Sequence, residues 1–145
     1  MANDDTPGAD REQYDTYDWT LDILVSFVAG MDEHTGPQMG LTLTVGGTLI
    51  SGTLCSMGAW LDAIAEIPVS SSDAEPVMDA IVDSWRETLP EMAAARAANP
   101  SRREFLHMRN ARVHMGSTNH NVGAIRVRLS EVTAWAFGEY LEAGE

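Results

Sequence analysis

The side chains most able to do chemistry in this chain are its four histidines. His107 and His114 are seven residues apart in a segment with the alternating pattern of a β-strand. In a regular strand they face opposite sides, and with a bulge between them they share a side but stand roughly 20 Å apart. Neither arrangement lets both imidazoles reach one ion at about 2 Å. Since His34 and His120 fall in predicted loops, the spacing predicts no metal site.

The sequence also shows no pattern typical of a nucleophile or of a phosphate site. Cys55, the only cysteine, has no histidine near it in the chain, and no serine stands in a GxSxG context. The glycines of GGTLISG lie in and after a predicted hairpin rather than between a strand and a helix, so they do not predict a phosphate cradle. We therefore expect a protein that is not an enzyme and holds no cofactor.

A group of cationic side chains is the strongest candidate for a binding site. Two neighbouring predicted strands carry it on the surface opposite the predicted core: Arg109, Arg112, Arg126, Arg128, His107 and His114. Because arginine pairs with carboxylates in a bidentate geometry, this patch could bind a partner protein or the acidic tail of another copy. The alternatives are unrelated surface arginines, or a contact with RNA.

The net charge of −13 is distributed unevenly along the chain. Residues 1–40 hold nine carboxylates and one arginine, residues 41–100 hold eight and two, and residues 101–145 hold five and six. The first hundred residues would repel phosphate, so nucleic acid is not the expected partner. The two ends of different copies would attract each other. The alternative is that the acidic surface only keeps the protein soluble.

The elements that must position the patch begin after a polar, acidic segment over residues 1–15, which we expect to be a disordered tail. Asp18 is the expected N-cap of a first helix. The helix is predicted from apolar residues at helical spacing: Trp19, Ile23, Leu24, Phe27, Val28 and Met31. We expect this stripe to be a packing face, with a partner surface as the alternative.

A hairpin is expected next. Residues 41–45 alternate between apolar side chains and threonine, and Gly46 and Gly47 supply the positive φ angles of a tight turn. Gly52 lies inside the second strand, where the missing side chain permits a bend or a close backbone approach.

Helical periodicity then runs from about residue 58 to residue 100, with a stop at Pro68. Ser72 or Asp73 can cap the second helix of this segment. Pro90 is expected to kink or divide that helix because it has no N–H to donate.

The last third of the chain is again typical of β-structure. The strand from residue 105 to residue 115 keeps its alternation only if a bulge lies near Arg109 and Asn110. Ser130 and Glu131 make a tight turn into the fifth strand. Because five short strands in an open sheet leave edges exposed, we predict that they close. The expected α+β fold is a single domain over residues 16–145, a five-stranded SH3/Sm-like barrel with an N-terminal helix and a helical insertion over about 58–100 between strands 2 and 3.

Membrane insertion and secretion are not expected. No run of the sequence approaches the roughly 20 apolar residues of a membrane helix. The N-terminus is acidic where a secretory signal would be basic. We therefore expect a cytoplasmic protein.

Two stretches resemble the gas vesicle accessory protein U (GvpU) family. The first is LTLTVGGTLISGTLCS followed by a helix, and the second is REFLHMRNARVHM together with VRLSEVTAWAFG. The resemblance covers roughly residues 16–64 and 103–138. The loop GSTNHNVG departs from the family pattern, so none of its residues is assigned. The motif positions that the resemblance implies are Ile50, Ser51, Gly52, Thr53, Leu54, Phe105, His107, Asn110 and Arg112.

The resemblance implies a cytoplasmic accessory protein of gas vesicles, the hollow protein-walled organelles that give buoyancy. Members of the family are linked to clustering of vesicles through multivalent self-association rather than to forming the wall. The implied partners are the gas vesicle shell or other gas vesicle proteins, and further copies of the chain. An Sm-like RNA-binding protein is the alternative, and saturable binding of short RNA would favour it.

Overall fold

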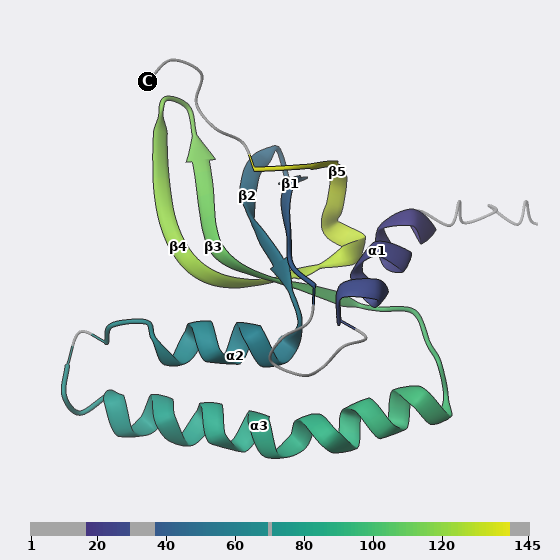
Figure 1. The fold of residues 1–145 in the computed structure, drawn as a ribbon. Helices are drawn as coiled ribbons and strands as arrows, with labels where there is room; N and C mark the ends of the chain where they lie inside the picture. The colour runs from purple at the N-terminus through teal and green to yellow at the C-terminus, as the bar shows by residue number, and fades with distance from the viewer. Residues whose placement is uncertain (1–16, 30–36, 70, 140–145) are drawn as a thin grey trace, which may run out of the picture.

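The computed structural model describes residues 17–29, 37–69 and 71–139 (Figure 1). Within these ranges the chain forms helices and a five-stranded antiparallel sheet, which confirms the predicted α+β class. The predicted disordered tail over residues 1–15 lies outside the described residues. The elements are α1 (Trp19–Ala29), β1 (Met39–Val45), β2 (Thr48–Cys55), α2 (Met57–Ala65), α3 (Glu75–Ala98), β3 (Phe105–Met115), β4 (Thr118–Arg128) and β5 (Val132–Phe137).

The sheet is open. Its strand order is β4-β3-β2-β1-β5, and each neighbouring pair is antiparallel. Because β4 and β5 are not paired with each other among the described strands, the predicted SH3/Sm-like barrel is not confirmed. The apolar face that a barrel would close upon itself is covered by α1 instead, since Leu21, Val25 and Val28 join the core of the sheet. In the predicted barrel, the apolar face of the sheet would pack against the opposite side of the same sheet. In the structure, it packs against α1.

Glycines shape the β1–β2 hairpin as expected. Gly46 and Gly47 have φ angles of +57° and +80° in the turn, which confirms the predicted tight hairpin. Gly52 lies where a Cβ would stand 3.0 Å from both the Cα of Ala111 and the carbonyl oxygen of Arg109. The predicted close backbone approach is therefore confirmed, between β2 and β3.

The predicted bulge in β3 is present. Asn110 has a φ of +50°, and the β3–β4 register shifts between Met108 and Ala111. The extra residue keeps Met108 and Ala111 on the same side of the sheet, where both are fully buried.

Helix α1 begins as predicted but turns a different face to the sheet. The Asp18 carboxylate accepts a hydrogen bond from the backbone N–H of Leu21 at 3.0 Å, which confirms the N-cap. The buried side chains are Leu21, Val25, Val28 and Ala29, whereas much of the predicted stripe is exposed: Trp19, Ile23 and Phe27. The helix is apolar on two sides, and only one can pack against a sheet. Met31 lies outside the described residues.

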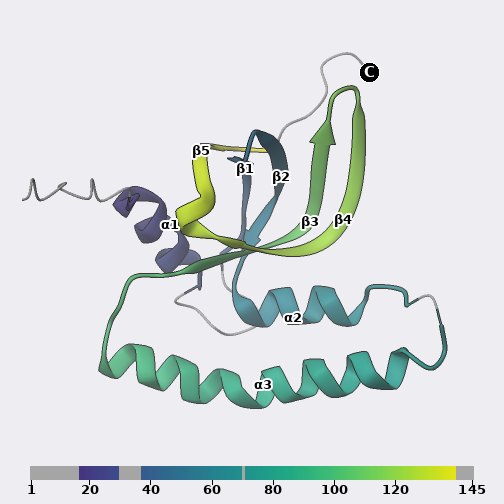
Figure 2. The same cartoon turned by 180° about the vertical axis from the view of Figure 1, so that it is seen from behind.

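Helices α2 and α3 form the predicted insertion between β2 and β3 and lie as a pair along one end of the sheet (Figures 1 and 2). Ser56 caps the N-terminus of α2, and its Oγ accepts from the N–H of Ala59. α3 starts after Ala74 with no side-chain cap, so the predicted cap at Ser72 or Asp73 is wrong. Pro90 does not divide α3, which runs from Glu75 to Ala98 and packs against α2 through the buried Val82.

Candidate carboxylate-binding groove

Five of the nine arginines line two adjoining hollows beside the start of β3. The larger hollow, of about 740 Å³, lies between the start of α1 and the end of β4. The smaller, of about 240 Å³, lies between the second half of α3 and the β3–β4 hairpin. Both are lined by the segment 101–104. We call the combined feature the arginine groove, after its cationic residues: Arg96, Arg102, Arg103, Arg126 and Arg128.

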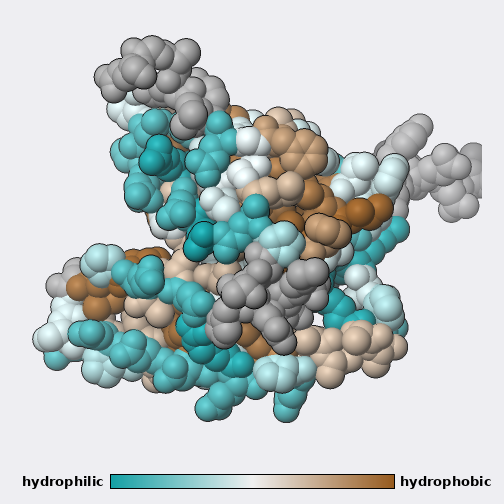
Figure 3. Space-filling model, in the orientation of Figure 1, coloured by the Kyte–Doolittle hydropathy of each residue, from teal (hydrophilic) through white to brown (hydrophobic). Residues whose placement is uncertain are grey.

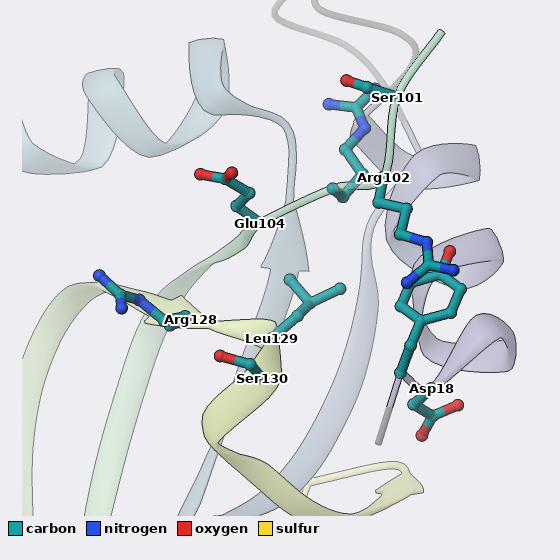
Figure 4. A pocket seen from close by; sticks show the side chains of 9 residues that line it. Asp18, Ser101, Arg102, Glu104, Arg128, Leu129 and Ser130 are labelled. Carbon is teal, nitrogen blue, oxygen red and sulfur yellow. The ribbon is translucent and has the colours of Figure 1, made fainter. Parts of the chain in front are cut away.

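The register of the β3–β4 hairpin brings these arginines together. Phe105 is paired with Arg128, and His107 with Arg126, so the end of β4 lies beside the start of β3. The segment that leads from α3 into β3 adds Arg102 and Arg103. Figure 4 shows Arg102 and Arg128 reaching the larger hollow from these two segments, with Glu104 between them.

Aromatic rings support three of the guanidinium groups. The guanidinium carbon of Arg126 lies 3.8 Å from the centre of the Phe105 ring, and that of Arg128 lies 5.6 Å from it. Arg102 stacks on Tyr17 at 3.8 Å. A guanidinium stacked on a ring loses side-chain freedom, so these arginines are partly ordered before a ligand arrives.

The groove is positive although the whole chain is strongly negative. Among the described residues, its lining includes two carboxylates, those of Asp18 and Glu104. Hydrogen bonds from the Thr20 hydroxyl, the Leu21 N–H and the Trp135 indole hold the pKa of Asp18 below its usual value. With five cations against two carboxylates, the groove is suited to bind an anionic group.

His107 lines the smaller hollow but is buried, so its predicted position on the surface is wrong. Its side chain is 8% exposed and meets Trp60 of α2 edge-on at 4.9 Å. Burial, together with the charges of Arg126 and Arg96, lowers the pKa of His107 to about 4. The imidazole is therefore neutral near pH 7. Its Nε2 is buried and has no hydrogen-bond partner among the described residues.

The other residues of the predicted patch do not all lie in one place. Arg126 and Arg128 line the groove, whereas Arg109, Arg112 and His114 are not among its lining residues. Arg109 donates to the Gln38 side chain and is half-buried, and Arg112 is exposed.

Three groove arginines were missed by the sequence prediction, which considered only the two strands. Arg102 and Arg103 directly precede β3, and that adjacency could have indicated them. Arg96 comes from α3, and no local pattern places it there.

The family model described as gas vesicle protein GvpU-like matches residues 18–140. The chain belongs to the GvpU-like family. The match covers most of the chain and confirms the resemblance noted in the sequence. No curated protein and no solved structure matches this GvpU-like chain.

Several motif positions of this GvpU-like protein have structural roles. Leu54 is fully buried in the core, Gly52 permits the close approach of β2 to β3, and Asn110 forms the bulge. The Phe105 ring lies under Arg126, and the Thr53 hydroxyl donates to the Glu139 carboxylate at 3.1 Å. These positions shape the sheet and the groove rather than contribute reactive groups.

The GvpU-like chain also places a serine, a histidine and an asparagine in a row. The Ser51 Oγ is 2.8 Å from His114 Nε2, and His114 Nδ1 is 2.6 Å from Asn119 Oδ1. This order matches the nucleophile, base and orienting group of some hydrolases. Ser51 is only 2% exposed, however, so a substrate cannot reach its hydroxyl. The row links β2, β3 and β4.

Metal and thiol chemistry have little support in the described part of the GvpU-like chain. No group of three or more His, Cys, Asp or Glu residues there could hold a metal ion. Burial raises the pKa of the Cys55 thiol to about 11, so Cys55 is a poor nucleophile. No helix among the described residues is long and apolar enough to span a membrane.

Proposed function

We propose that this GvpU-like protein is a non-enzymatic gas vesicle accessory protein that binds carboxylate-bearing surfaces through its arginine groove. The proposed partners are gas vesicle proteins and other copies of the chain, in the cytoplasm and on the vesicle. The observation that carries the proposal is the gathering of five arginines around two hollows in a chain of net charge −13.

Charge complementarity supplies the physical reason for self-association. The groove arginines lie between residues 96 and 128, whereas seventeen of the 22 carboxylates precede residue 101. One copy can therefore present carboxylates to the groove of the next, and the contact can repeat from copy to copy. Repeated contacts between copies bound to different vesicles would hold those vesicles together.

RNA binding has no comparable support. That alternative depended on a closed Sm-like barrel and on arginines spread along two strands, but the sheet is open and the arginines are divided. The first hundred residues, with seventeen carboxylates and three arginines, would also repel phosphate.

Light scattering against salt concentration tests the charge-driven contact. We expect assemblies of the purified protein to disperse as sodium chloride rises from about 50 mM to about 500 mM, because charges at protein surfaces are screened within about 8 Å at physiological ionic strength. Scattering that stays constant or rises with salt would count against the proposal.

Matched variants locate the contact. Arg126→Gln and Arg128→Gln remove one charge each from the groove, and we expect both to reduce scattering and co-sedimentation with purified gas vesicles. Arg112→Gln removes the same charge from an exposed position of β3 that does not line the groove. An equal effect of all three substitutions would assign the attraction to net charge rather than to the groove.

A further inference from the structure

The exposed face of α1 is apolar and carries no charge. The exposed residues of the helix are Trp19, Thr20, Ile23 and Phe27. We call three of them the α1 stripe, since 62% of Trp19, 60% of Ile23 and 69% of Phe27 is exposed. In Figure 3 hydrophobic colours appear where α1 and the neighbouring β5 lie.

The acidic residues of this region are directed into hydrogen bonds. Asp22 is half-buried and its Oδ1 accepts from the backbone N–H of Arg103 at 3.0 Å. Asp18 accepts from Leu21 and from the Trp135 indole. Among the described residues, α1 of this chain of net charge −13 therefore has a face without an exposed carboxylate.

The spacing of the stripe favours a second copy as its partner. Trp19, Ile23 and Phe27 are four residues apart and form one ridge along the helix. Ridges of this i±4 type interdigitate with one another at a crossing angle of about −50°, which is the commonest helix packing in globular proteins. Two copies related by a two-fold axis present the same ridge to each other, so the surface is complementary to itself.

We propose that the α1 stripe is a two-fold interface at which α1 of one copy packs against α1 of another; this proposal rests on the self-association proposed above and adds a second, apolar contact to the charged one. The neighbouring strand β5 pairs with β1 alone among the described strands and has no charged residue. There Phe137 is 67% exposed and lies 5.5 Å from Trp135, which is bonded to Asp18 at the start of α1.

The size of the stripe predicts a weak dimer. Three large side chains that are mostly exposed present roughly 400 Å² on each copy, which reaches the size of a functional patch. The two copies together would bury roughly 800 Å² there, below the 1,200–2,000 Å² of a stable complex. The expected dissociation constant is therefore on the order of micromolar.

Sedimentation equilibrium of the full-length chain in about 1 M sodium chloride tests the interface, because this salt screens the charged contact to about 3 Å. We expect a monomer–dimer equilibrium that salt does not weaken. The double substitution Ile23→Ser and Phe27→Ser should weaken it at least tenfold. A matched control, Val77→Ser and Ile81→Ser, removes apolar side chains from the exposed face of α3 and should leave dimerisation unchanged.

Cross-linking provides a second measurement. Ile23 is the middle residue of the stripe, so Ile23→Cys should form a disulfide-linked dimer under oxidation, whereas Val77→Cys should not. The native Cys55 is 2% exposed and stays unreactive. Retention of native circular dichroism by every variant excludes unfolding as the cause of a loss.

Three results would overturn the inference. The first is a monomer at all concentrations in high salt, and the second is dimerisation of the Ile23→Ser/Phe27→Ser variant as strong as that of the original chain. The third is binding of the full chain to phosphatidylcholine vesicles that the same substitutions abolish. The last would assign the stripe to a lipid surface. The proposed function fails separately, through salt-insensitive scattering and unaffected groove variants.

Discussion

His107 packs edge-on against Trp60 and lies close to the charges of Arg96 and Arg126, yet none of the described residues forms a hydrogen bond with its Nε2. A charged imidazole there would be desolvated and would meet two like charges, so the folded state holds the neutral form. The same residue in an exposed strand would titrate near 6.5.

This burial makes stability depend on pH. The pKa of His107 is about 4 in the folded state against about 6.5 when unfolded. Between these two pH values, His107 is protonated in the unfolded chain and neutral in the folded chain. His107 therefore hardly lowers the free energy of unfolding above about pH 6.5, and lowers it progressively as the pH falls toward 4. Between about pH 7.5 and about pH 5 we expect a loss of about 2 kcal/mol that His107→Phe abolishes, measured by urea unfolding.

Comparison of two variants isolates this effect from the titration of carboxylates, which both retain. His120→Gln replaces an exposed histidine of β4 and should keep the pH dependence of the original chain. Identical pH profiles for His107→Phe and the original chain would show that His107 is protonated in the folded protein.

At the scale of elements, α3 continues through a proline. Pro90 stands inside Glu75–Ala98, so the carbonyl four residues earlier lacks its helical N–H donor. The helix persists because Val82 is buried against α2, with Met78 and Leu89 packed beside it. Arg86 of α3 also bonds Asp62 of α2 at 2.5 Å. Tertiary packing thus outweighs the local cost of the proline.

Replacing this proline should stabilise the protein. Pro90→Ala restores the missing hydrogen bond at an exposed position, and we expect the free energy of unfolding to rise by about 1–3 kcal/mol. Thermal and urea unfolding measure the change. The neighbouring Glu91→Ala is the control, since it alters an exposed side chain without adding a backbone bond, and it should change stability by less than about 0.5 kcal/mol. A destabilised Pro90→Ala variant would show that α3 requires the proline.

The whole molecule combines two surfaces of different chemistry. The arginine groove is cationic, and the binding of carboxylates that we propose for it would weaken in salt, whereas the α1 stripe is apolar and uncharged. A two-fold contact alone stops at a dimer, and a groove-to-acid contact alone links copies in a row. If both proposals hold, the two surfaces together would give each copy more than one way to bind another, as clustering of vesicles would require.

Large assemblies should therefore depend on both surfaces. At low salt we expect the original chain to form particles whose size exceeds that of Arg126→Gln/Arg128→Gln and of Ile23→Ser/Phe27→Ser severalfold, by dynamic light scattering. The variant carrying all four substitutions should remain a monomer. Particles of unchanged size after removal of either surface would contradict a combined mechanism.

The sequence by itself determined the features that depend on neighbouring residues. The Gly46–Gly47 turn, the cap at Asp18, the bulge at Asn110 and the close approach at Gly52 follow from local backbone preferences, and all are present. The α+β class and the place of the helical insertion follow from periodicity. The family followed from motif residues that mainly shape the sheet.

Only the tertiary structure decided which faces are covered. The sequence pattern of an apolar ridge on α1 is the same whether the ridge packs on the sheet or faces solvent. In the structure, Leu21, Val25 and Val28 are buried. Trp19, Ile23 and Phe27 are exposed. Similarly, His107 is a surface residue by strand alternation until α2 packs over it. Burial, charge and partner choice depend on contacts between segments far apart in the chain, which local patterns do not encode.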